Sequence, residues 1–131
     1  MAAAFVGVWK LDRVDGAEEY FHATGQTEAL QEIEKIASIE ILLDGTDLTT
    51  ITNIDGRDPR RETHTLGETY ESQGPGGVKI KAKSYMDGDK LVSEGSAGEM
   101  EWIAVRYFRG SAMVTELTSK GKTMTFTLVK V

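Results

Sequence analysis

Turn signals recur along most of the chain, and their spacing limits the folds that it can adopt. Asp44-Gly45, Asp55-Gly56 and Asp87-Gly88 are dipeptides that favour two-residue hairpin turns. The segments between such signals are short, and several alternate apolar with polar side chains, as strands with one buried face do. Strands are expected over residues 39–43, 48–54, 60–66, 68–73 and 78–84, and further turns at 74–77, 95–98, 109–110 and 120–121. A spacing of roughly eleven residues predicts an antiparallel meander, closed as a barrel or folded as a sandwich.

The beginning of the chain has a different pattern, in which one strand is followed by helices. Residues 5–12 alternate with a period of two and predict a first strand. Asp15 and Glu18 form a capping-box pattern that predicts a helix over Ala17–Thr24. Gly25 suits the left-handed residue that commonly ends a helix.

A second helix is predicted directly after the first. Thr27 is suited to cap it, and its apolar face is formed by four residues, Leu30, Ile33, Ile36 and Ala37. Because isolated helices of this length are unstable in water, both are expected to pack on the strands.

Composition and charge exclude several classes of protein. The chain of 131 residues fits one domain, residues 1–131, and its 40% hydrophobic content is that of a globular protein. The absence of cysteine excludes disulfides and thiolate chemistry, and a net charge of −6 argues against nucleic-acid binding. No segment approaches the ~18 apolar residues of a membrane span, and the start does not read as a signal peptide. The expected location is therefore the cytoplasm.

Several short motifs along the chain resemble those of one known family. Residues 5–11, with the sequence FVGVWKL, resemble the amino-terminal F-x-G-x-W-K-L signature of the fatty-acid-binding protein family, the intracellular lipid-binding proteins. Tyr20 followed by Gly25 resembles its first helix. Residues 66–68, 87–92 and 105–106 follow in the family's order and at nearly its spacing. The resemblance covers the whole chain, with small gaps near the second helix and near Arg109.

The resemblance implies an all-β fold, a ten-stranded antiparallel up-and-down β-barrel, or β-clam, with a helix-turn-helix lid between its first two strands. Such a barrel binds one hydrophobic ligand in its interior, as a monomer, without a metal or cofactor. Transient membrane contact through the helical lid is left open. A barrel of this size has room for one small ligand.

Arg106 is the main candidate for contact with the polar end of a ligand. If Arg106 faces inward, alternation along the strand also turns four neighbours inward, namely Met100, Trp102, Ala104 and Phe108. A buried guanidinium needs a partner, and its shape matches a carboxylate. In the family, an arginine at this place contacts the head group of the ligand. The alternatives are that Arg106 pairs with an internal acid, Glu116 or Glu94, or that it points outward.

The last strand departs from the family pattern. Many members have an Arg-x-Tyr pair there, which completes a carboxylate clamp, whereas this chain has Phe126 and Leu128. Together with Met124, these residues predict an apolar inner face. A lone arginine, or a pocket for a more neutral ligand, would remain.

Other candidates for the cavity wall follow from alternation and from the lid. The strand candidates are Val78, Ile80, Ala82, Ser84, Met113, Thr115 and Leu117, and the lid candidates are Tyr20, Leu30 and Ile33. Small residues and methionines suit an adaptable lipid pocket, although they suit an ordinary core equally well. The lid residues have helix packing as their alternative role.

Two basic runs stand out in this acidic chain. Residues 57–61 lie near the predicted portal rim, where they would guide an anionic ligand or a membrane, or simply be solvated. Lys79, Lys81 and Lys83 share the outer face of one predicted strand. His22 and His64 are far apart and belong to no nucleophile or metal-ligand pattern, so no enzyme is expected.

The leading hypothesis is a carrier that holds one fatty acid or related amphipathic lipid, with its polar end near Arg106. A second hypothesis keeps the barrel and changes the ligand to a retinoid, a sterol-like or bile-salt-like molecule, or a neutral lipid. In a third, the barrel is a structural protein whose interior is filled by its own side chains, such as Trp102 and Phe126.

Overall fold

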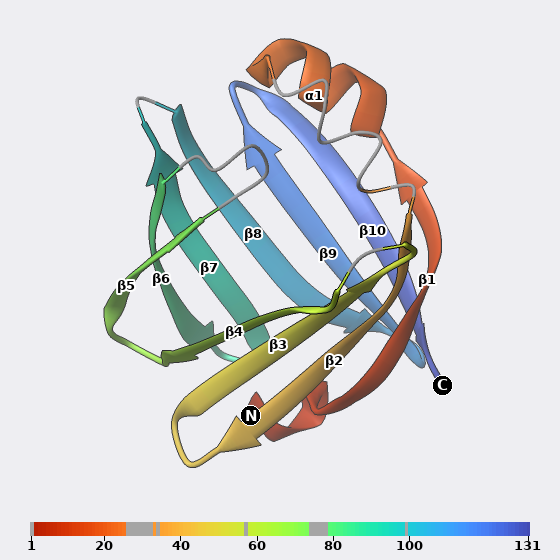
Figure 1. The fold of residues 1–131 in the computed structure, drawn as a ribbon, viewed down its shortest axis with the longest axis vertical. Coiled ribbons are helices and arrows are strands. Elements are labelled where there is room, and N and C mark those ends of the chain that lie inside the picture. The colour runs from red at the N-terminus through yellow and green to blue at the C-terminus, as the bar shows by residue number, and fades with distance from the viewer. Residues whose placement is uncertain (1, 26–32, 34, 57, 74–78, 99) are drawn as a thin grey trace.

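Ten strands form one sheet in which every pair of hydrogen-bonded neighbours is antiparallel (Figure 1). The structure, a computed structural model, describes residues 2–25, 33, 35–56, 58–73, 79–98 and 100–131. The strands are β1 (Gly7–Asp15), β2 (Ile36–Asp44), β3 (Asp47–Ile54), β4 (Arg60–Thr65), β5 (Thr69–Gln73), β6 (Lys79–Asp87), β7 (Lys90–Ala97), β8 (Met100–Arg109), β9 (Ala112–Ser119) and β10 (Lys122–Lys130). A short 3-10 helix, Ala2–Phe5, precedes them, and α1 (Ala17–Thr24) follows β1. The predicted all-β fold of ten strands is confirmed.

The first strand joins the two halves of the sheet, because β1 pairs with both β2 and β10, and the sheet curves into a nearly closed barrel. Its order runs from β4 through β3, β2, β1, β10, β9, β8, β7 and β6 to β5. The two end strands, β4 and β5, are consecutive in the chain but are not paired by backbone hydrogen bonds. We call the boundary between them the seam, and it makes the barrel a clam with one unpaired side.

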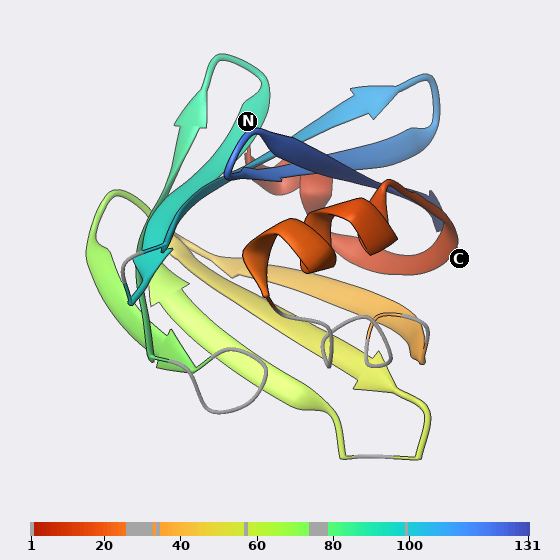
Figure 2. The same cartoon turned by 90° about the horizontal axis from the view of Figure 1, so that it is seen from above.

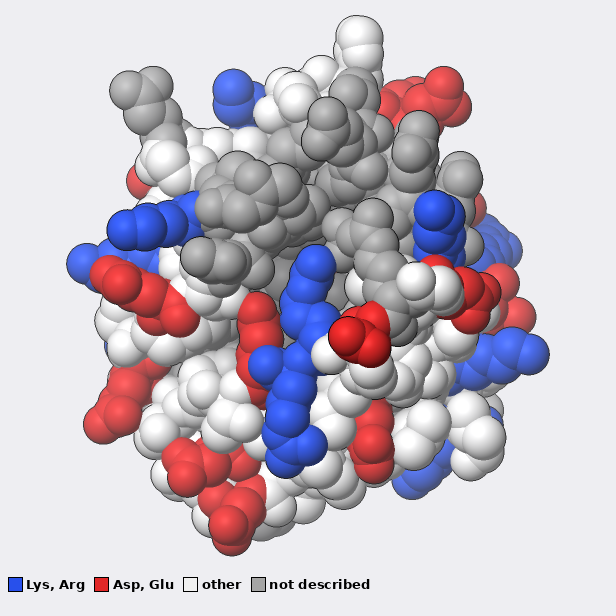
Figure 3. Space-filling view, in the orientation of Figure 1, with Lys and Arg blue, Asp and Glu red and all other residues white. Residues whose placement is uncertain are grey.

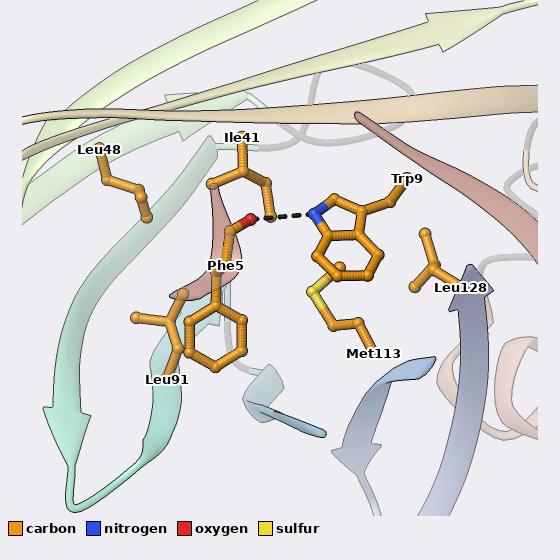
Figure 4. Close-up of a cluster of buried hydrophobic side chains, with 7 residues drawn as sticks. All are labelled: Phe5, Trp9, Ile41, Leu48, Leu91, Met113 and Leu128. Atoms are coloured by element: carbon orange, nitrogen blue, oxygen red, sulfur yellow. Dashed lines mark hydrogen bonds between the residues drawn. The ribbon is translucent and has the colours of Figure 1, made fainter. Parts of the chain in front are cut away.

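Large apolar side chains fill one end of the barrel, which we call the plug. Its seven buried members are Phe5, Trp9, Ile41, Leu48, Leu91, Met113 and Leu128 (Figure 4). The indole Nε1 of Trp9 donates a hydrogen bond of 2.9 Å to the backbone carbonyl of Phe5. Phe5 was predicted within the first strand, but it ends the 3-10 helix and folds back under Trp9. The opening motif therefore builds the closed end of the barrel.

The helix α1 covers the opposite end, where it lies across the mouth of the barrel (Figures 1 and 2). Tyr20 and Phe21 are almost fully buried and pack against Met124 of β10. The helix has the predicted bounds, and Gly25 ends it with a φ of 73°. Because a short helix is unstable alone, this apolar contact is what holds α1 in place.

The predicted capping role of Asp15 is wrong. Asp15 is the last residue of β1, where it pairs with Thr125 of β10 and its carboxylate accepts a hydrogen bond of 2.8 Å from Arg13. The cap position is Gly16, with a φ of 75° and no side-chain cap. A Cβ at Gly16 would lie 2.7 Å from the backbone oxygen of Thr123, so only glycine fits where the chain passes β10.

The second predicted helix lies mostly outside the described residues, which include neither Thr27 nor Leu30. Ile33 is helical. Ile36 and Ala37 were predicted on the apolar face of this helix, but they belong to β2, where Ile36 pairs with Ile54 of β3. The ladder with β3 thus extends further toward the lid than the helical pattern indicated. Among the described helices, none is long and apolar enough to cross a membrane.

One predicted turn is displaced. Gly95 was expected to open the turn at 95–98, but it lies within β7, and the left-handed residue of that turn is Gly98. A Cβ at Gly95 would lie 2.3 Å from the backbone oxygen of Lys81 and 2.8 Å from the Cβ of Ala82. Glycine therefore permits the close approach of β6 to β7 at this point. The predicted turn at 74–77 lies outside the described residues.

Candidate ligand-binding site

Two adjoining cavities lie inside the barrel between the plug and α1. The first, which we call the apolar chamber, has a volume of about 300 Å³ and lies beneath the helix. The second, the polar chamber, has a volume of about 270 Å³ and lies beside β4 and β5. Thr52, Arg60, Ile80 and Trp102 line both chambers, so the two adjoin each other. A ligand pocket of this kind, mostly apolar with a few convergent polar groups, is typical of small-molecule sites.

The apolar chamber brings together eight of the residues predicted from the sequence. Tyr20 and Phe21 of α1 form one side, and β8, β9 and β10 form another. The predicted residues that line it are Tyr20, Ile33, Ile80, Met100, Trp102, Leu117, Met124 and Phe126. They come from segments far apart in the chain, which the closed sheet places around one space.

The polar chamber contains Arg106 of β8, together with its strand neighbours Trp102 and Ala104. All three therefore face the interior, and the alternative in which Arg106 points outward is wrong. Arg106 has no hydrogen bond or ion pair with a described residue, and the surface that it keeps accessible faces the chamber. Burial lowers the pKa of the guanidinium, and the nearby Tyr70 opposes this shift. An arginine nevertheless stays charged in a protein, so a positive charge faces the cavity.

Neither acid that was considered as a partner for Arg106 bonds to it. The carboxylate of Glu94 accepts a hydrogen bond of 3.1 Å from the hydroxyl of Tyr85. That of Glu116 accepts one of 3.0 Å from the hydroxyl of Tyr107. The alternative in which an internal ion pair neutralises Arg106 is therefore wrong for these two acids.

Side chains inside the barrel bridge the seam that backbone hydrogen bonds leave open. Ser72 of β5 donates a hydrogen bond to Oε1 of Glu62 on β4. The ring of His64 on β4 stacks on Tyr70 of β5, with centroids 3.9 Å apart and an angle of 14° between the rings. These contacts hold the edges of the two strands together through their inward faces.

His64 also connects the seam to the next strands. Its Nε2 lies 3.1 Å from the hydroxyl of Ser84 on β6, which lies 2.7 Å from the hydroxyl of Ser93 on β7. Nδ1 of His64 is buried and has no hydrogen-bond partner among the described residues. Burial lowers the pKa of His64; Glu62 opposes the shift and Arg106 adds to it. The ring is therefore neutral near pH 7.

Several predicted residues line neither chamber. Leu128 and Met113 lie in the plug, and Thr115 is a buried residue of β9 opposite Arg106 in the ladder. Phe108 stacks on Phe5 at the plug, with ring centroids 4.8 Å apart. Ala82 and Ser84 are buried in β6, whereas Val78 and Leu30 lie outside the described residues.

The polar wall of the cavity was missed by sequence reasoning. Glu62, His64, Tyr70, Ser72, Ser93, Thr50 and Thr52 all line the polar chamber. Arg60, Glu62 and His64 are spaced two apart, which already indicated a common face of one strand. Nothing in that spacing said which face was inside, and apolar residues are the usual choice for an inner face.

The two basic runs differ in their surroundings. Arg60 lines both chambers and Arg61 is exposed, whereas Arg57 lies outside the described residues. Lys79, Lys81 and Lys83 are exposed on β6, as predicted. On the face shown in Figure 3, one short column of basic side chains is flanked by acidic ones. Among the described residues, no group of three or more histidine or acidic side chains is placed to hold a metal ion.

Comparisons with known proteins agree on the fold. No protein-family model matches the sequence. The REP1-NXSQ fatty acid transporter is similar, with a TM-score of 0.88 and 20% identity over 99% of this chain and 98% of that chain. A Schistosoma mansoni fatty acid binding protein in complex with arachidonic acid has a TM-score of 0.88 and 19% identity over 98% and 97%. The fluorescent protein UnaG has a TM-score of 0.89 and 22% identity over the full length of both chains.

These similarities show that the chain has the fold of the fatty-acid-binding proteins. The resemblance read from the opening motif is thus confirmed at the level of the fold. With identities of 22% or less, these similarities show the fold alone, and a function can be inferred only from the cavity.

Proposed function

We propose that this protein is a non-catalytic carrier that holds one amphipathic acidic lipid, such as a fatty acid, inside the barrel. The observation that carries the proposal is a guanidinium without a protein partner among the described residues, facing a cavity that adjoins an apolar chamber. The acidic group would bind at Arg106, and the hydrocarbon chain would extend past Trp102 toward α1.

The energetics favour this orientation. A charge that is removed from water without a partner is costly, and a carboxylate satisfies a guanidinium through two parallel hydrogen bonds. The hydrocarbon part gains about 25 cal/mol for each Å² of apolar surface that leaves water. Affinity would therefore come mainly from the apolar chamber, and orientation from Arg106.

The similar proteins support the class of ligand. One is named a fatty acid transporter, and another is described in complex with arachidonic acid. By analogy we propose that this chain works as a cytoplasmic monomer. Entry and release would require movement of α1, and contact of this lid with a membrane would be transient.

A neutral lipid, retinoid, sterol-like or bile-salt-like ligand is the second candidate. Its support is the apolar last strand, where Met124 and Phe126 line the chamber without a polar partner for Arg106. A barrel filled by its own side chains has less support, because two cavities of about 300 and 270 Å³ lie inside.

Ligand displacement tests the proposal. A delipidated sample is loaded with a fluorescent fatty-acid probe and titrated with a long-chain fatty acid and with the alcohol of the same length. The expected result is saturable displacement by the acid at one site for each chain, with weaker displacement by the alcohol. Equal displacement by the two would favour a neutral ligand. No displacement by either, with no lipid in an organic extract of the purified protein, would refute the carrier role.

A further inference from the structure

The polar chamber contains a carboxylate and a guanidinium that do not form an ion pair with each other. Arg106 on β8 and Glu62 on β4 line the same cavity, yet they form no ion pair within the 4.0 Å that defines one. Glu62 makes one hydrogen bond to a described residue, from Ser72 to Oε1. Its other oxygen, Oε2, has no partner among the described residues. Two groups of opposite charge, one on β4 and one on β8, thus face the polar chamber.

Glu62 and Arg106 both act electrostatically on two stacked rings of the chamber wall. Glu62 and Arg106 shift the pKa of His64 in opposite directions, and they do the same to the pKa of Tyr70. The acid and the base are therefore close to the same pair of stacked rings. A ligand group that enters the chamber is therefore exposed to both charges.

The rest of the chamber wall also favours a head group with more than one polar function. The hydroxyls of Thr50, Ser72 and Ser93 line it. Its volume of about 270 Å³ is several times the ~30 Å³ that a water molecule occupies in the liquid. A carboxylate bound at Arg106 would leave most of this space, and the free oxygen of Glu62, without a ligand contact.

We propose that the polar chamber selects acidic lipids that carry a hydrogen-bond donor, a hydroxyl or an amide N–H, close to their carboxylate. The carboxylate accepts from Arg106, and the neighbouring donor bonds to the free oxygen of Glu62. This inference rests on the proposed carrier function and names the class of ligand within it.

The chemistry of Glu62 explains the selection. An ionised carboxylate only accepts hydrogen bonds. It therefore binds a hydrogen-bond donor and repels another carboxylate placed directly beside it. Ser72 fixes one of its oxygens, which leaves the other directed to a ligand or to water. A site built to bond a donor discriminates against an analogue that lacks it, since its own polar group is then left unpaired.

A matched pair of ligands tests the inference. N-hexadecanoylglycine has an amide N–H next to the carbon that bears its carboxylate, and N-hexadecanoylsarcosine has a methyl group in place of that hydrogen. Competition against a fluorescent fatty-acid probe gives the affinity of each, with hexadecanoic acid as the reference. The expected result is about tenfold tighter binding of the glycine compound than of the sarcosine compound, as one hydrogen bond to a charged group provides.

Two variants of Glu62 test whether this residue causes the preference for the glycine compound. Glu62→Gln keeps an acceptor and loses the charge, so the preference should fall to roughly threefold. Glu62→Leu removes the acceptor, and the two ligands should then bind about equally. Glu71→Gln is the matched control, because Glu71 is exposed on β5 and lines neither chamber, and it should leave the ratio unchanged.

The outcomes separate the inference from the function on which it rests. Binding of all three ligands without preference in the unmodified protein would overturn the inference and leave the carrier function standing. A preference that survives both Glu62 variants would also overturn it, since the donor would then be read elsewhere. If none of the three ligands displaced the probe, the carrier function itself would fail. Should Glu62→Leu not fold, the near-isosteric Glu62→Gln still decides the question.

Discussion

At the scale of single residues, the main feature of this barrel is that polar side chains line part of its interior, where apolar side chains are usual. Arg106, Glu62 and His64 face a cavity, although charged residues are rarely buried unless they are paired. The apolar residues Phe126 and Met124 occupy the opposite wall. The cavity thus has one polar side and one apolar side, as a site for an amphipathic molecule requires.

His64 makes the stability of the fold depend on pH. Because burial lowers its pKa in the folded protein, the unfolded chain takes up a proton first as the pH falls. The free energy of unfolding should therefore fall as the pH drops below about 6.5, and level off below the folded pKa. The contribution of this one group is at most about 1.4 kcal/mol per pH unit.

Urea denaturation at several pH values between 7.5 and 5.5 tests this expectation. His64→Gln should lose less stability across this range than the unmodified protein does. His22→Gln, on the exposed side of α1, is the control. The same pH dependence in His64→Gln as in the unmodified protein would show that the buried ring is not responsible.

Gly95 is a second position at which one residue decides local packing. An added Cβ would meet the backbone of β6 at 2.3 Å, so Gly95→Ala should displace β6 from β7. The expected loss of stability is about 1–3 kcal/mol, as for other overpacked sites. Ser96→Ala, at the next position of β7, should change the free energy of unfolding in urea far less. Equal stability of the two variants would contradict the steric argument.

At the scale of elements, α1 and the seam are two parts of the described chain that backbone pairing between strands does not hold. The helix is held through Tyr20 and Phe21, which pack on Met124. The seam is held through Glu62 with Ser72 and through the stack of His64 on Tyr70. Parts with fewer backbone hydrogen bonds open at lower free energy, so both are suited to admit a ligand.

Phe21→Ala tests the role of α1 as a lid. Replacement of a buried phenylalanine by alanine costs about 3–5 kcal/mol in a closed core, and a value near 3 is expected here because Phe21 already borders a cavity. The dissociation rate of a bound fluorescent fatty acid should rise as well, since the helix is less firmly held. Stopped-flow displacement measures this rate, and Glu18→Ala, exposed on the same helix, is the control. A slower or unchanged rate in Phe21→Ala would argue for a route that avoids α1.

At the scale of the whole molecule, the number and direction of the strands could be predicted from turn dipeptides and alternation. The bounds of α1 and the left-handed Gly25 could also be predicted, because helix boundary signals are local, although the cap itself was wrongly assigned to Asp15. The role of Gly16 could not, since it depends on how closely β10 passes. The position of Gly95 within β7 likewise depends on a strand that is distant in sequence.

Apart from Arg106, which the family resemblance indicated, the candidate site was predictable on its apolar side only. Trp102, Leu117 and Phe126 follow from alternation and from the ordinary rule that inner faces are apolar. A barrel that binds a polar group has polar side chains on part of its inner wall. In the sequence, Glu62 and Tyr70 therefore look like surface residues. Only closure of the sheet shows that β4 and β5 turn them toward Arg106.

The most direct test of the central claim is the affinity of Arg106→Leu for an acid and for a neutral lipid of the same length. Isothermal titration with hexadecanoic acid and with hexadecanol is compared for the unmodified protein, for Arg106→Leu and for Arg109→Leu, an exposed arginine of the same strand. We expect Arg106→Leu to bind the acid at least about tenfold more weakly while its affinity for the alcohol changes little, and Arg109→Leu to bind both as before. Equal losses for the acid and the alcohol, or no loss for either, would contradict it.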